Sequence, residues 1–168
     1  MKTFGRNALL FTALLAAAGC SAAGEGAGSG HAEEHADAHH TANGDLRETT
    51  ASLSALPSFL DEQPEAVRNA YIIAAMSADV LDYIPCYCGC GEIAGHVSNK
   101  NCFIAEISDD GAVVWDDHGT RCGVCLQIAV EAASMKKDGA SLQDIRDAID
   151  AKYKDVGPAT PTPQPPAA

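Results

Sequence analysis

The sequence predicts a mainly α fold, namely a small helical domain with one β-hairpin insert and a Cys-rich loop, flanked by disordered termini. Apolar residues recur at helical spacing within segments 65–76, 121–137 and 142–153. The Asp110-Gly111 pair between two short apolar runs is typical of a hairpin turn. Both ends of the chain have low-complexity compositions, which cannot bury enough apolar surface to offset the entropy lost on ordering.

The size and charge of the chain exclude one class of function. Its 168 residues suffice for one ordinary domain with tails, and its formal net charge is -12. A nucleic-acid-binding protein needs a basic surface that neutralises phosphates. We therefore expect no nucleic-acid partner, and the acidic surface is sufficiently explained by solubility.

The first part of the chain has the pattern of a targeting segment, and we expect residues 1–20 to be a lipoprotein signal peptide. A basic start precedes an apolar stretch at 8–18 that is too short to span a bilayer comfortably. Small residues then lead to Cys20, which would carry the lipid that anchors the protein. Ala17 stands where leucine is commoner, and the alternative is an ordinary secretory signal in which Cys20 is removed or incidental. On the first interpretation the protein is a membrane-anchored lipoprotein outside the cytoplasm, in the periplasm or on the outer cell surface.

The segment 21–52 is expected to be a disordered His-rich tether, because it consists largely of small and polar residues. Histidine tracts of this kind commonly bind zinc, copper or nickel weakly. The expected auxiliary ligands, which lie four residues apart or adjacent, are His31, His35, His39 and His40. The alternative is a solvated linker in which these histidines have no role.

The folded Cys-rich domain is expected over residues 53–155. Pro64 begins its first helix, which runs to about residue 76, and one further turn covers 78–83 before Pro85 ends it. Hairpin strands are expected at 103–108 and 112–115.

The carboxyl-terminal part of the domain is expected to be helical. A helix over 121–137 has basic residues in its last turn, and Ser141 is expected to cap the last helix. Residues 156–168 are rich in proline, and we expect them to form a disordered tail.

Three thiols occupy five consecutive positions within segment 85–91, where packing alone gives no reason for cysteine at alternate residues. Gly89 would let this loop curl and present its sulfurs to one ion. Thiolates favour copper(I) and zinc over magnesium or calcium, so the expected cofactor is a copper or zinc ion. The expected metal ligands, all thiol or imidazole donors, are Cys86, Cys88, Cys90, Cys102, Cys122, Cys125, His96 and His118.

Two alternatives for the same cysteines remain open at this point. Outside the cytoplasm, six thiols could instead form three disulfides that staple a membrane-surface interaction module without metal. The pair Cys122 and Cys125 at a helix start is also typical of a thiol-disulfide oxidoreductase. The run of strands and helices that such an enzyme requires is missing around this pair, so we do not expect an enzyme.

Several segments together resemble the bacterial PCYCGC-motif lipoprotein family over about residues 56–153. The segments that carry the resemblance are 82–91, Gly95-His96, 101–103, 115–119 and Cys122-x-x-Cys125. The resemblance implies a secreted, lipid-anchored bacterial protein, and the assignment of metal rests on the residues themselves.

The sequence therefore predicts an extracytoplasmic, lipid-anchored protein that binds a soft metal, copper before zinc, for capture, buffering or delivery. The membrane, through the lipid, and a metal donor or acceptor protein are the expected partners. The 85–91 loop follows one helix end, whereas Cys122 and Cys125 lie at another helix start. One shared site requires these two ends to face each other in space.

Overall fold

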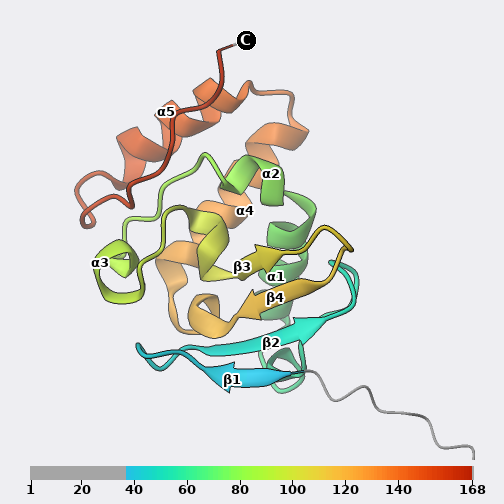
Figure 1. The fold of residues 1–168 in the computed structure, drawn as a ribbon. Helices are drawn as coiled ribbons and strands as arrows, with labels where there is room; N and C mark the ends of the chain where they lie inside the picture. The colour runs from blue at the N-terminus through green and yellow to red at the C-terminus, as the bar shows by residue number, and fades with distance from the viewer. Residues whose placement is uncertain (1–36, 168) are drawn as a thin grey trace, which may run out of the picture. The chain divides into compact units, whose positions relative to one another are not determined.

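The computed structural model describes residues 37–167 (Figure 1), and within them the fold is mainly α, as predicted. One four-stranded antiparallel sheet accompanies the helices. The α-helices of this part of the chain are α1 (Glu65–Met76), α2 (Ala78–Leu81), α3 (Cys90–Ala94), α4 (Gly123–Lys137) and α5 (Leu142–Tyr153). Helix α1 packs against α4, which in turn packs against α5.

The helix boundaries follow local sequence signals. Helix α1 begins directly after Pro64, with Glu65 in its first turn, as expected. Ser141 caps α5, where its hydroxyl accepts a hydrogen bond of 3.1 Å from the backbone N–H of Asp144. Helix α4 begins two residues later than predicted, because Asp117–Arg121 forms a 3-10 helix and Cys122 becomes the cap.

The sheet has the strand order β1-β2-β4-β3, and every neighbouring pair is antiparallel. Its strands are β1 (Ala38–His40), β2 (Leu46–Thr50), β3 (Ile104–Ile107) and β4 (Val113–Asp116). The predicted hairpin is confirmed as β3 and β4, with Gly111 at a φ of 92° in the turn between them. Figure 1 shows β2 beside β4, so the sheet extends beyond the hairpin.

The expectation of a disordered tether up to residue 52 is wrong for its last part, since β1 and β2 belong to the sheet. Strand β2 is polar, yet its side chains have specific partners in the fold. The Trp115 indole N–H donates to the Thr50 hydroxyl at 2.8 Å, and Arg47 forms an ion pair of 2.9 Å with Asp116. These contacts stabilise a strand whose composition alone would leave it unfolded.

The expectation of a disordered tail is also wrong for residues 157–167, which we call the tail. Thr160 is only 4% exposed, and its backbone N–H donates to the carbonyl of Cys86 at 2.9 Å. The Thr162 hydroxyl donates to the carbonyl of Val97 at 2.7 Å. Prolines restrict the backbone in advance, so this segment loses less entropy on docking than its lack of regular structure suggests.

Gly119 provides a first test of the packing around the site. A Cβ at this position would lie 2.8 Å from Cε1 of Phe103 and 2.9 Å from the carbonyl oxygen of Cys102. Gly119→Ala is therefore expected to lower the free energy of unfolding by about 1–3 kcal/mol, as measured by urea denaturation. A Cβ at Gly123 meets nothing within 4 Å, so Gly123→Ala is the matched control. Equal stabilities of the two variants would contradict the described packing.

Candidate metal centre

Six cysteines of the described chain have free thiols, and contacts of 3.3–3.8 Å link five of their sulfurs in two groups. Sulfur–sulfur distances are 3.3 Å from Cys86 to Cys125, 3.5 Å from Cys86 to Cys88, and 3.5 Å from Cys88 to Cys125. The Cys90 and Cys102 sulfurs are 3.8 Å apart. The members of this thiol cluster are Cys86, Cys88, Cys90, Cys102, Cys122 and Cys125.

These distances describe separate thiols. A disulfide bond would bring two sulfurs to about 2.05 Å. Two thiolates bound to one tetrahedral zinc ion, with Zn–S of about 2.3 Å, lie about 3.8 Å apart. The cluster therefore has spacings close to those of a metal–thiolate centre.

The local structure around the motif explains how the thiols converge. The segment 85–91 follows α2, and Gly89 adopts a left-handed conformation with φ of 85° that places Cys90 at the start of α3. Cys122 caps α4, and its sulfur accepts a hydrogen bond of 3.3 Å from the N–H of Cys125. The prediction that the loop and the helix start face each other is confirmed by the contacts of Cys86 and Cys88 with Cys125.

Two imidazoles lie beside the thiols. Nδ1 of His96 is 3.5 Å from the sulfur of Cys102, and the ring centroids of His96 and His118 are 4.8 Å apart. His118 offers a donor atom within 4.8 Å of the sulfurs of Cys88, Cys122 and Cys125, which also lie within 4.8 Å of one another. All eight predicted donors are thus brought to one region of the fold.

Only two of the four histidines of the predicted auxiliary tract lie within the described residues. His39 and His40 lie in β1 and are exposed. His31 and His35 lie outside the described residues, as does Cys20. Their proposed roles remain predictions.

Contacts among the thiols lower the pKa of some of them and raise the pKa of others. Hydrogen bonds from Cys122 and Cys125 lower the pKa of Cys88 to about 2, and those from Cys102 and Cys125 lower the pKa of Cys90 to about 2. The contact with Cys102 contributes most to raising the pKa of Cys125. A thiolate that accepts hydrogen bonds from its neighbours is stabilised, while the donors keep their protons. Thiols that keep their protons would release them when a metal ion binds.

His118 is oriented by the carboxylate of Asp45, which is not among the predicted site residues. Its Nδ1 lies 3.2 Å from Oδ2 of Asp45, a buried residue just before β2 that also pairs with Arg121. Because Asp45 occupies Nδ1, Nε2 remains for the thiols. The contact with Cys88, together with Asp45, raises the pKa of His118 to about 9. Asp45 is 73 positions from His118, so no local pattern could indicate this pair.

The tail supports segment 85–91, which we call the motif loop, from outside the cluster. The Thr160 hydroxyl accepts a hydrogen bond of 2.9 Å from the N–H of Cys86, while the Thr160 N–H donates to the Cys86 carbonyl. Arg146 of α5 donates to the carbonyls of Tyr83 and Pro163, at 3.1 Å each, and so joins the tail to the chain before the motif. Thr160 could not be predicted from the sequence, because the proline-rich composition of the tail gives no sign that its Thr160 and Thr162 hydroxyls have buried partners.

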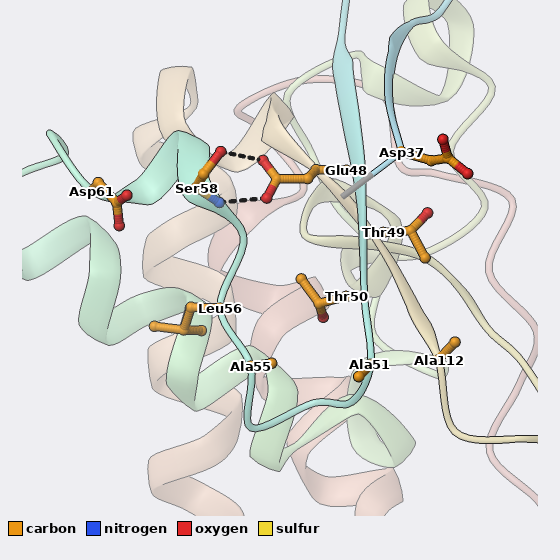
Figure 2. A pocket seen from close by; sticks show the side chains of 10 residues that line it. All are labelled: Asp37, Glu48, Thr49, Thr50, Ala51, Ala55, Leu56, Ser58, Asp61 and Ala112. Atoms are coloured by element: carbon orange, nitrogen blue, oxygen red, sulfur yellow. Dashed lines mark hydrogen bonds between the residues drawn. The ribbon is translucent and has the colours of Figure 1, made fainter. Parts of the chain in front are cut away.

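A cavity of about 520 Å³ lies elsewhere, between β2 and segment 51–61 (Figure 2). The carboxylate of Glu48 in this cavity is already held by the N–H and the hydroxyl of Ser58, at 2.6 and 2.7 Å. None of the described residues that line it is a cysteine or histidine. The thiol cluster therefore remains the candidate site.

A family model described as "Protein of unknown function with PCYCGC motif" matches residues 9–166. No curated protein and no solved structure matches the chain. Over residues 37–167, no helix is both long enough and apolar enough to cross a membrane.

Proposed function

The chain belongs to the family of proteins with a PCYCGC motif, and we propose that it is an extracytoplasmic, lipid-anchored protein that binds a soft metal. Copper is the preferred metal and zinc the next. The protein would capture the ion, buffer it, or pass it to a partner protein. Cys20 would carry the lipid, and the histidines of the tether would collect ions near the membrane surface.

One observation carries this proposal: six free thiols and two imidazoles converge at one largely buried site. Such a concentration of thiol donors is typical of sites for copper(I), zinc or iron–sulfur clusters. Zinc prefers four tetrahedral ligands, whereas copper(I) also accepts three thiolates. Overlapping triads, such as Cys86, Cys88 and Cys90, favour copper(I).

The exposure of the thiols supports exchange of the ion with a partner. Cys88 and Cys122 are partly exposed, whereas Cys86, Cys90, Cys102 and Cys125 are buried. A partner's thiolate could therefore reach the cluster at Cys88 and Cys122. Oxidoreductase activity of Cys122 and Cys125 remains the less favoured alternative, and an insulin-reduction assay tests it.

Metal analysis of the full-length protein, purified under anaerobic and reducing conditions, tests the proposal. We expect copper or zinc to copurify, or the reduced protein to bind copper(I) with loss of free thiols. A protein that takes up neither metal after reduction would refute the proposal. If its native mass is also lower by about six hydrogens, all six thiols are paired as disulfides and the stapled interaction module is favoured instead.

Asp45→Asn tests the contribution of the carboxylate that orients His118. We expect the affinity for copper(I) to fall by about 10–100-fold, because replacing a residue that hydrogen-bonds to a metal ligand commonly lowers metal affinity by this factor. Competition with a chromophoric copper(I) chelator gives the affinity. Asp117→Asn is the matched control, since Asp117 also pairs with Arg121, through Oδ2 at 2.5 Å, but within residues 37–167 no hydrogen bond joins it to a histidine ring. Equal losses in both variants would contradict a specific role for Asp45.

A further inference from the structure

The cluster has more donor atoms than one metal ion can bind. Resting on the proposed function, we propose that the cluster holds at least two metal ions, one in an outer site and one in an inner site. The outer site is formed by Cys88, His118 and Cys122. The inner site is formed by Cys90, His96 and Cys102. Cys86 and Cys125 lie between the two and are shared.

The number of donors supports more than one ion. Eight thiol and imidazole donors lie in contact or near-contact within the cluster. A zinc ion takes four ligands and a copper(I) ion no more than four. A single ion would leave at least four donors unused, and at least two of these would be thiols in the oxidising compartment that the proposed function assigns.

The outer site is a complete ligand set on the accessible side of the cluster. Together with Cys125, its three residues offer donor atoms that all lie within 4.8 Å of one another. Cys88, His118 and Cys122 are each partly exposed. An incoming ion or a partner's ligand can therefore reach this site directly.

The inner site is fully buried. The sulfur of Cys102 lies 3.8 Å from that of Cys90 and 3.5 Å from Nδ1 of His96. His96 is 2% exposed, and its Nε2 has no hydrogen-bond partner in the part of the chain that the structure describes. A nitrogen of this buried imidazole also lies within 4.8 Å of the Cys90 sulfur and of a nitrogen of His118, which supports a ligand role for His96.

Shared thiolates connect the two sites. Cys86, Cys102 and Cys125 have sulfurs within 4.8 Å of one another, and Cys125 also belongs to the outer set. The sulfurs of Cys86 and Cys125 are 3.3 Å apart. A thiolate has several lone pairs and can bridge two soft ions, so an ion can move inward without leaving sulfur coordination. The outer ion should therefore exchange quickly and the inner ion slowly.

Titration of the reduced, full-length protein with copper(I) tests this inference without any substitution. Native mass spectrometry under anaerobic conditions is expected to show species with two or more copper ions. Removal of copper by excess bathocuproine disulfonate is expected to occur in two phases that differ in rate by about 10-fold or more. A single ion at saturation, or a single phase of removal, would overturn the two-site proposal while leaving the proposed function intact.

A matched pair of variants assigns the two phases. His118→Gln is expected to lose the fast phase and keep the slow one, whereas His96→Gln is expected to lose the slow phase and keep the fast one. Circular dichroism confirms that each variant is folded. Loss of the same phase in both variants would overturn the assignment of outer and inner sites. Failure of the wild-type protein to bind copper(I) at all would instead refute the proposed function.

Discussion

Replacement of Cys125 by serine is expected to lower the affinity of the protein for copper(I) by about 100-fold or more. The sulfur of Cys125 lies 3.3 Å from that of Cys86 and 3.5 Å from that of Cys88, so it touches two other ligands. Loss of a residue that only hydrogen-bonds to a metal ligand often lowers metal affinity by about 10–100-fold. Loss of a ligand that the two proposed sites share should have a larger effect. Competition with a chromophoric copper(I) chelator measures the change.

Cys122→Ser is the matched control for this prediction. Cys122 belongs to the same Cys-x-x-Cys pair, but it is partly exposed and contributes to a single group of potential ligands. Its replacement should lower the affinity less than that of Cys125 and should leave part of the bound copper in place. Circular dichroism of both variants shows whether the fold persists. Equal effects in the two variants would show that Cys125 is not shared.

Local sequence signals were sufficient to predict α1, α2, α4, α5 and the main features of the site, but not the short helix α3. The apolar spacing predicts α1 and α5, and the Asp-Gly turn predicts the hairpin of β3 and β4. The pattern of cysteines also predicts that the motif loop and the start of α4 meet, since neither group of thiols forms a complete site alone. These inferences succeed because they depend on neighbours in sequence or on the chemistry of the residue types.

The parts that could not be predicted depend on contacts between distant residues. Strand β2 carries Arg47, Glu48 and two threonines, a composition that gives no clear strand pattern. Its partners are Trp115 and Asp116 of β4. The tail and Asp45 were missed for the same reason, since their roles arise from hydrogen bonds across more than 70 positions. Secondary-structure propensity and composition are weak predictors where specific polar partners decide whether a segment is ordered.

The tail is expected to control how long the cluster keeps its ion. The Thr160 hydroxyl accepts the hydrogen bond of the buried Cys86 N–H at 2.9 Å, directly at a shared ligand. Thr160→Val would leave this N–H without a partner, which costs about 1–3 kcal/mol. Release of the motif loop from the tail should relieve part of that cost. Copper(I) dissociation should therefore accelerate by about 10-fold. Urea denaturation and the rate of copper transfer to a chelator measure the two effects.

Two further variants separate the hydroxyl from other features of the tail. Thr160→Ser keeps the hydroxyl and should preserve both the stability and the slow release of copper. Gly157→Ala leaves every ligand unchanged but would place a Cβ 2.7 Å from the carbonyl oxygen of Tyr87, so it should lift the tail and accelerate release. Fast release in Thr160→Val and Gly157→Ala, but not in Thr160→Ser, would assign copper retention to the docked tail. Unchanged release in all three variants would show that the thiols hold the ion without its help.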